Sequence, residues 1–403
     1  MRLVHTSDWH LGHTLHDRDR GAEHAAFVEW LLGQLSLEKP ELLLIAGDVF
    51  DVANPAASAV AAWYRFLLAA HVACPDLTIV VIAGNHDSGT RLDAPKELLG
   101  HFRVHIVGAV PRRADGTTDS GAMLVPIVDA AGALLARVAA VPFLRPSDLV
   151  GGEDPDRWVE AIRAVYADVF ALAPDDGVPL LAMGHSYMVG GQVSDLSERK
   201  ILGGNLHALP DDIFPERVRY AALGHLHLAQ KVGKRSTVRY SGSPLPLALD
   251  ERDYPHQICV VDVDGTALEI RHSRTPRTIP CPRIPEKGSV SLAEAVMRLR
   301  AWASDEPGWI EVCVRFDAAD INIRAQLEEA VEGKVARVLR ITTEGGGAGG
   351  QLGDLEQAAD LSQLSEEDVF KRRWESHAGA EPVPDDLMVL FHECLDAAKQ
   401  EAR

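Results

Sequence analysis

Two histidines, His225 and His227, end the apolar run YAALGHLH with a single leucine between them. Side chains two residues apart in an extended strand point to the same side of the backbone, so both imidazoles can face one site. Imidazole is the commonest protein ligand for metal ions. Taken alone, the pair is also compatible with two ordinary surface or core histidines, and other parts of the chain must decide between these interpretations.

Four other apolar runs end in residues of the same kind. These endings are Asp8-Trp-His10, Gly47-Asp48, Gly84-Asn85-His86-Asp87 and Gly184-His185. Ligand sites in α/β sheets form at the carboxyl ends of strands, so we expect all five endings to converge in one crevice. Five such endings favour a shared metal site over coincidence.

The ligand types indicate which metals the site would bind. Seven side chains are candidate ligands: Asp8, His10, Asp48, Asn85, His185, His225 and His227. Oxygen and nitrogen ligands without cysteine favour Mn²⁺, Fe²⁺ or Zn²⁺ over a structural thiolate zinc site. Seven ligands are too many for one ion and predict two ions, with Asp48 as the bridging carboxylate. Ions about 3.5–4 Å apart activate water and neutralise phosphoryl oxygens in phosphoester hydrolysis.

The elements that position these residues are short apolar runs that alternate with helix-length segments. Each run is nearly continuously apolar, which is typical of a strand covered on both faces. The runs are RLVHTSD, ELLLIAGD, LTIVVIAGN, PLLAMGH and YAALGH, and helices are predicted over 56–70 and 158–172. This alternation predicts a layered α/β domain, assigned to residues 1–275.

The sequence changes character after this domain. Prolines in 274–285 exclude regular structure. The sequence that follows predicts a small α+β domain, 276–343. Its expected elements are a helix over 291–303, which opens with capping-box spacing, strands over 309–316 and 335–342, and a helix over 321–331. A glycine-rich linker, 344–354, then leads to 355–403, which is predicted to form two amphipathic helices. Such a short segment buries little surface alone, so we expect it to dock on another surface.

Charge restricts how the chain could bind nucleic acid. The 403 residues carry a net charge of −19, which argues against a protein that coats nucleic acid with its whole surface. A local basic patch could still neutralise backbone phosphates without reading sequence. The candidates, for which an ordinary solvated surface is the alternative, are Arg145, Lys231, Lys234, Arg235, Arg239 and the pair Arg199-Lys200.

Cysteine usage and hydropathy bear on the compartment. The five cysteines lack C-x-x-C spacing, so neither a disulfide framework nor a zinc knuckle is indicated. The start of the sequence lacks the charged and apolar regions of a secretory signal, and the most apolar window, 58–74, contains Arg65 and His71. We therefore expect a cytoplasmic protein without a membrane partner.

The motif order D-x-H, GD, GNH, GH, GHxH resembles that of the calcineurin-like metallophosphoesterases. More narrowly, AGDVFDVANP, AGNHDSGTRL, VPFLRPSD, ALGHLHLAQKV and YSGSPLPLALDE resemble the SbcD-type nuclease subunits, bacterial relatives of the Mre-type double-strand-break nucleases. The resemblance is dense over residues 1 to about 255 and rests on layout beyond. It implies an α/β fold: a four-layer β-sandwich flanked by helices, with a small α+β capping domain and a helical C-terminal tail.

The resemblance also implies a division of the ligands between two ions, Mn²⁺ being the expected metal. One ion would be held by Asp8, His10, Asp48 and His227, and the other by Asp48, Asn85, His185 and His225. His86 would be a catalytic histidine that stabilises the transition state or protonates the leaving oxygen, with support of the ligands as its alternative role. Asp51 matches a phosphatase position that orients this histidine, although Mre-type relatives more often have histidine there. Asp87 is a further supporting candidate.

The function implied is that of a Mn²⁺-dependent DNA nuclease subunit in repair and recombination. It would act on double-stranded ends in the 3′ to 5′ direction and on single strands and hairpins, together with the SMC-like ATPase SbcC. It would form a homodimer through helix 56–70 and the stretch after Asp87, and associate with the nucleoid. One alternative is a phosphatase or small-molecule phosphodiesterase, yet Ala83 and Val52 stand where phosphatases usually carry arginine. A non-catalytic scaffold is the other, although the ligand set is intact.

Overall fold

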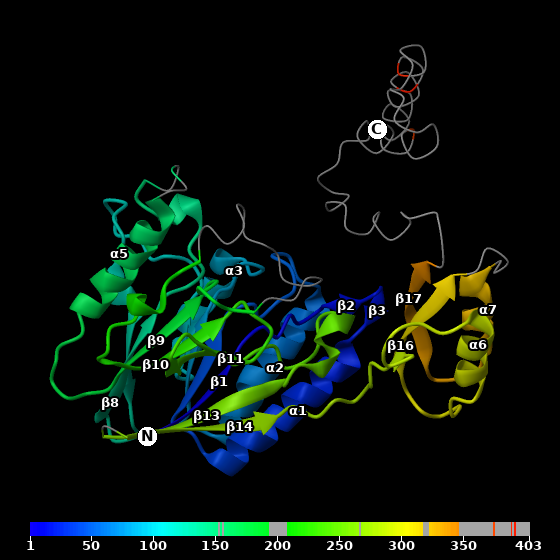
Figure 1. Ribbon diagram of the computed structural model, residues 1–403. Coiled ribbons are helices and arrows are strands. Elements are labelled where there is room, and N and C mark those ends of the chain that lie inside the picture. The colour runs from blue at the N-terminus through cyan, green and yellow to red at the C-terminus, as the bar shows by residue number, and fades with distance from the viewer. Residues whose placement is uncertain are drawn as a thin grey trace.

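The computed structural model describes residues 1–151, 154, 157–192, 208–265, 267–316 and 322–345, with single positions at 374, 388 and 391. The pair Arg199-Lys200, the predicted linker beyond Gly345 and, apart from those single positions, the predicted tail lie outside the described residues. Two six-stranded sheets form the main body, in the orders β14-β13-β1-β4-β5-β6 and β11-β12-β10-β9-β8-β7. Figure 1 shows both sheets between helices.

The first sheet has a parallel centre, in which β1, β4, β5 and β6 run side by side. β13 and β14 extend it as an antiparallel edge. Its strands are β1 (Arg2–Thr6), β4 (Leu42–Ala46), β5 (Thr78–Ile82), β6 (Val104–Val107), β13 (Gln257–Asp264) and β14 (Ala267–Arg274). Every residue of β4 and β5 is buried, as the continuous apolar runs predict.

The second sheet is also mixed. β8, β9, β10 and β12 are parallel, whereas β7 and β11 pair antiparallel with their neighbours. Its strands are β7 (Leu124–Val128), β8 (Leu134–Ala140), β9 (Leu180–His185), β10 (Val218–Gly224), β11 (Gln230–Val232) and β12 (Arg235–Tyr240). All six residues of β9 are buried.

Helices cover the sheets on two sides of the molecule. α1 (Gly21–Glu38) and α2 (Ala57–Ala73) pack Phe27, Leu31 and Trp63 against the first sheet, whereas α5 (Trp158–Ala171) packs against the second (Figure 1). The shorter elements are β2 (Thr14–Leu15), β3 (Arg18–Asp19), α3 (Gly89–Asp93), α4 (Lys96–Gly100), η1 (Ser120–Met123), η2 (Pro146–Asp148), η5 (Asp211–Ile213) and η6 (Leu249–Asp253). The order helix, sheet, sheet, helix confirms the expected four-layer sandwich.

The described residues of 283–316 and 322–345 include a separate small sheet, two helices and a core of their own. Parallel strands β15 (Arg283–Ile284), β16 (Trp309–Phe316) and β17 (Arg337–Gly345) pack against α6 (Leu292–Arg300) and α7 (Ile323–Ala330). The Ser291 hydroxyl accepts the Glu294 amide at 3.3 Å, as the capping-box spacing predicts. The prediction of no regular structure over 274–285 was wrong at β15, because prolines are tolerated beside a short edge strand.

The small C-terminal unit packs on the main body beside η6. Arg252 of η6 forms an ion pair with Glu311 of β16, which is 5% exposed. Arg20 lies 5.5 Å from the ring centroid of Trp309. A small apolar cluster, which includes Leu249 and Trp309, fills the contact. Within the described ranges, no helix has both the length and the apolar composition of a membrane span.

Candidate metal centre

The five ligand-bearing strand ends meet where the two sheets face each other. β1, β4 and β5 contribute from the first sheet, and β9 and β10 from the second. The crevice predicted from strand ends is therefore formed between two sheets. The two sheets approach so closely that a Cβ at Gly224 of β10 would lie 1.9 Å from the carbonyl oxygen of Ala46 in β4. Within the first sheet, the loops after β4 and β5 are equally close, since a Cβ at Gly84 would lie 2.1 Å from Asp48 Oδ1. Glycine is required at both positions for this approach.

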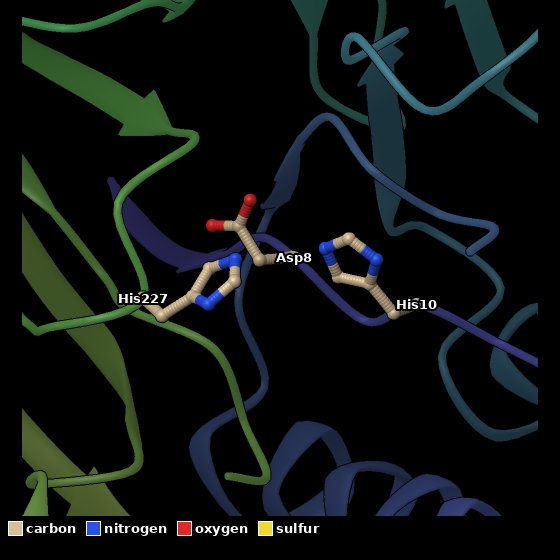
Figure 2. Close-up of side chains that lie close together, drawn as sticks. All are labelled: Asp8, His10 and His227. Atoms are coloured by element: carbon tan, nitrogen blue, oxygen red, sulfur yellow. The ribbon is translucent and has the colours of Figure 1, made fainter. Parts of the chain in front are cut away.

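Asp8, His10 and His227 form the first ligand group, in which the candidate ligand atoms all lie within 4.8 Å of one another. Figure 2 shows their side chains directed toward a common space, from the segments that follow β1 and β10. Trp9 points the opposite way, into the helix-facing core, where it packs edge-on to Phe66 with ring centroids 4.9 Å apart. Burial of this indole therefore holds its two neighbours toward the metal site.

Asp48 joins the first group to a second one. Its Oδ2 lies 3.5 Å from His10 Nε2 and 3.3 Å from His185 Nε2. Asn85 Oδ1 lies 3.0 Å from His185 Nε2 and 3.0 Å from His225 Nδ1. All seven predicted ligands are thus brought into one cluster, in which Asn85 is half-buried and the other six are buried, with the Asp48 carboxylate between the two groups.

Four of these seven residues have a backbone conformation that L-amino acids rarely adopt. The φ angles are 56° at Asp8, 45° at His10, 50° at Asp48 and 103° at His225. Hydrogen bonds hold the strained segments, since the amides of Asp8 and His10 donate to the carbonyls of Gly47 and Asp48, each at 3.0 Å. Such strain collects at functional sites, where the surrounding fold enforces it.

Burial and charge act in opposite directions on the ionisable ligands. Burial lowers the pKa of His185, but the Asp48 carboxylate outweighs burial and raises that pKa to about 9. Burial would raise the pKa of Asp48, yet the imidazoles of His185 and His10 hold it well below its usual range. Burial raises the pKa of Asp8, and burial together with His185 lowers the pKa of His225 to about 3. A proton on His185 thus balances the buried Asp48 charge, and a bound cation would take over this role.

The residues fit a binuclear divalent metal site. His10 Nε2 is buried and has no hydrogen-bond partner among the described residues, although it faces Asp48. A buried polar atom without a partner is costly, and coordination to a metal would satisfy it. The surrounding donors are carboxylate, amide and imidazole groups with no thiolate, which suits a hydrolytic metal centre.

His86 lies beside this cluster, on the loop after β5. Its amide donates to Asp48 Oδ1 at 2.9 Å, and its Nδ1 lies 2.6 Å from the main-chain carbonyl oxygen of Asp51. The Asp51 carboxylate lies against His10 Nδ1 instead, at 3.2 Å. The carboxylate predicted to orient His86 therefore orients a ligand candidate, because the loop after Asp48 turns its side chain toward β1.

Asp87 is a buried carboxylate that supports the site. It accepts hydrogen bonds from the amides of Val49, Phe50 and Gly84 at 2.9–3.1 Å. This carboxylate is 1% exposed and ties the β4 and β5 loops together. Its pKa is raised to about 6 by burial and by the nearby Asp48 charge.

Glu251, which the sequence did not single out, holds a ligand candidate in place. It is fully buried in η6, and its Oε1 lies 2.7 Å from His227 Nδ1. Its Oε2 accepts the Leu247 amide at 2.7 Å. A carboxylate on Nδ1 fixes the tautomer and presents Nε2 to a metal. The only sequence signal was an acidic residue inside the run PLPLALDE, and nothing there indicated that it faces inward.

The basic candidates divide between the metal site and the second sheet. Arg145 Nη2 donates to the Asp87 carbonyl oxygen at 3.1 Å, so its guanidinium lies at the metal-site loop. Arg235 donates to the carbonyls of Phe214 and Val218, and Arg239 lies beside the buried Cys259 thiol. Lys231 and Lys234 are exposed on the β11–β12 hairpin. Among the described basic candidates, Arg145 is therefore the one whose contacts place it at the metal-site loop.

The two facing sheets and the ligand cluster at their strand ends define the class of this protein. They are the architecture of a calcineurin-like phosphoesterase, and the sequence model of that family matches residues 1–229. A second model, described as the type 5 capsule protein repressor C-terminal domain, matches residues 282–378.

Comparison with known proteins narrows the class to one family. The chain is 39% identical over 356 residues to the SbcD subunit of nuclease SbcCD from Rhodobacter capsulatus, and the match covers 85% of this chain and 87% of that protein. Proteins of the same name from Escherichia coli strain K12 and Bacillus subtilis are 33% and 31% identical, with coverage of 93% and 100% of this chain and 92% and 99% of their own lengths. The chain belongs to the SbcD family of nuclease subunits and is a metal-dependent phosphodiesterase.

Proposed function

We propose that the chain is the Mn²⁺-dependent nuclease subunit of a complex with an SbcC-type ATPase, and that it hydrolyses phosphodiester bonds of DNA during repair and recombination. The observation that carries this proposal is the position of the Asp48 carboxylate, which lies within 3.5 Å of imidazoles from both ligand groups. This placement suits a bridging ligand between two cations. Family membership supports DNA as the substrate.

We assign the ligands to two ions in the way that the family resemblance implies. One ion would be held by Asp8, His10, Asp48 and His227, and the other by Asp48, Asn85, His185 and His225. The oxygen and nitrogen donors suit Mn²⁺, Fe²⁺ or Zn²⁺, and the family resemblance favours Mn²⁺ among these. When bound, the two ions would lower the pKa of a shared water and neutralise charge on the phosphoryl oxygens.

We assign His86 the role of acting on the leaving group. The contact between its Nδ1 and the Asp51 carbonyl assigns the Nδ1 position to a proton donor, because a carbonyl oxygen can only accept. In the doubly protonated imidazolium, the opposite ring nitrogen, Nε2, would carry the second proton and would give it to the leaving oxygen or donate a hydrogen bond to that oxygen. The hydrogen bond from the His86 main-chain N–H to Asp48 Oδ1 holds the His86 backbone beside the ligands.

The remaining parts of the chain are assigned to partners. Residues 1–275 would form the nuclease domain, 276–343 a capping domain that recognises DNA, 344–354 a linker, and 355–403 a helical segment that binds SbcC. α2 exposes an apolar stripe of Tyr64, Leu68 and Val72, which are 40%, 60% and 71% exposed. Spacing of four residues places them on one helix face, which supports a homodimer interface there.

Cleavage assays with the purified chain test this function. End-labelled duplex and hairpin DNA would be incubated with Mn²⁺, with and without the SbcC-type ATPase, beside Asp48→Asn protein as the inactive control. We expect Mn²⁺-dependent degradation from 3′ ends and hairpin opening by the unmodified chain. Hydrolysis of a phosphoserine peptide or a cyclic dinucleotide, with both DNA substrates left intact, would assign the site to a phosphatase or small-molecule phosphodiesterase instead.

A further inference from the structure

A cavity of about 210 Å³ adjoins the metal centre on the side of His185. It lies between the loop after β8, the helix α5 and the segment that follows β9. Its lining among the described residues is almost entirely apolar and rich in aromatic rings, with Phe143, Trp158, Ile162, Tyr166, Tyr187 and Leu209 as the principal side chains. The proposed metal-centred mechanism makes no use of this space.

The cavity shares one wall with the ligand cluster. His185 contributes to the lining, and its imidazole meets the Phe143 ring edge-on at 6.2 Å between centroids. The Phe143 amide donates to the Ala83 carbonyl oxygen at 2.9 Å, which ties this aromatic ring to the loop that carries Asn85 and His86. A group bound in the cavity would therefore lie directly beside a phosphate held at the metals.

A guanidinium lies beside Phe143, one of the aromatic side chains that line the cavity. The Arg145 side chain lies 5.5 Å from the Phe143 ring centroid, and Arg145 Nη2 donates to the Asp87 carbonyl oxygen. The loop after β8 thus offers an apolar aromatic surface and, two residues later, a cation. A nucleotide has the same two features, a flat aromatic base and an anionic phosphate, joined by a sugar.

The size and the apolar lining of the cavity favour a single nucleotide base as its occupant. Its volume is below the roughly 300–1,000 Å³ of pockets for drug-sized ligands and suits one flat ring system. Aromatic side chains stack on any base, because every base has a π-face. A sugar or phosphate would lose hydrogen bonds to water in such a lining without replacing them.

We propose that this cavity binds one base of the DNA strand, in the nucleotide next to the scissile phosphate. The base would leave its stack to enter, and the apolar lining would accept any base. Arg145, which lies beside Phe143, would hold the adjoining backbone phosphate. This inference rests on the proposed nuclease function and adds the position of the substrate strand, which enters the metal centre along the face of His185 and Phe143.

Binding without metal tests the proposal. Three single-stranded oligonucleotides serve as probes. One has a base at every position, one has an abasic residue at the 3′ end, and one has an abasic residue at the second position from the 3′ end. Their affinities are measured by fluorescence anisotropy in EDTA. Loss of the base that occupies the cavity should weaken binding to the unmodified chain about 10- to 100-fold. Equal affinity for all three oligonucleotides would overturn the proposal.

A cavity-filling variant locates the effect. Ile162→Trp on α5 would occupy the space with an indole, so it should bind the base-containing and abasic strands with the same reduced affinity. Ala167→Trp places the same residue at an exposed position of α5 and should behave as the unmodified chain. Unchanged discrimination by folded Ile162→Trp protein would exclude this cavity. If circular dichroism shows that this variant does not fold, Tyr187→Ala removes a stacking ring instead, and undiminished discrimination by it overturns the proposal.

Cleavage data separate this inference from the proposed function. DNA cleavage by the unmodified chain with Mn²⁺, without any effect of the abasic residues, would refute the base cavity alone. A clear effect of the abasic residues on binding, without DNA cleavage in any divalent metal, would refute the proposed nuclease function and leave the cavity as a site for a nucleotide base.

Discussion

Replacement of Glu251 by glutamine tests how far the metal centre depends on a residue that does not touch the ions. Glu251 is fully buried, and its two oxygens lie 2.7 Å from His227 Nδ1 and 2.7 Å from the Leu247 amide nitrogen. Both partners are donors in the arrangement that leaves His227 Nε2 for a metal. A glutamine side chain offers only one acceptor oxygen, so its amide group must face one of these donors.

The expected loss follows from that mismatch. Removal of the partner of a metal-bound histidine typically reduces metal affinity about 10- to 100-fold. This corresponds to about 1.4–2.7 kcal/mol, because each tenfold change is about 1.4 kcal/mol. We expect the loss in the ion held by Asp8, His10 and His227. The ion held by His185 and His225 should keep its affinity, since the Glu251 carboxylate binds His227 and the Leu247 amide on the other side of the cluster.

Isothermal titration with Mn²⁺, on protein stripped of metal by a chelator, measures the two affinities separately. Asp250→Asn is the matched control, because Asp250 is the exposed neighbour in the same short helix η6. Thermal unfolding without metal shows whether the variant has lost its fold. Unchanged affinity at both sites would refute the role given to Glu251, and an equal loss at both sites would show that the substitution disturbs the whole crevice.

Three of the remaining predictions concern the chemistry and the SbcC partner, and a fourth concerns the homodimer. Asp48→Asn removes the only proposed bridge, so metal analysis should find fewer bound ions and DNA assays no cleavage; full activity in saturating Mn²⁺ would contradict this. His86→Asn should retain two ions and DNA binding but lose about 10²–10⁴ in turnover, whereas loss of one ion would make His86 a ligand. Truncation after Gly345 should leave metal binding intact and abolish capture of SbcC, which a pull-down at undiminished affinity would refute. Leu68→Glu should convert a dimer to a monomer in sedimentation, and an unchanged dimer would place the interface elsewhere.

The convergence of the candidate ligands could be predicted from the sequence because strand ends carry their own signal. Each apolar run stops at a carboxylate, amide or imidazole, and buried strands bring such ends together. The helix predicted over 56–70 is α2, Ala57–Ala73, and the strand predicted over 309–316 is β16 without any shift. These elements are specified by local patterns, so a single sequence was sufficient.

Contacts between distant segments could not be predicted in this way. The sequence does not distinguish strands of the first sheet from strands of the second, because both sheets are covered on both faces. Glu251 lies 24 residues after His227, and only the course of the chain through η6 directs it inward. The Asp51 carboxylate faces His10 and not His86 because the loop after β4 turns it that way. Side-chain direction in loops depends on packing that has no periodic pattern.

The left-handed backbone at four ligand positions lowers the stability of the fold, although it positions side chains that the function needs. An L-residue in that conformation costs about 1–2 kcal/mol, and glycine avoids the cost. Selection of variants for heat resistance alone, in the absence of metal, would therefore favour glycine at Asp8, His10 or Asp48, and each gain would delete a ligand. Directed evolution toward a more robust enzyme must screen for catalysis at every round, because here the easiest stabilising substitutions are inactivating ones.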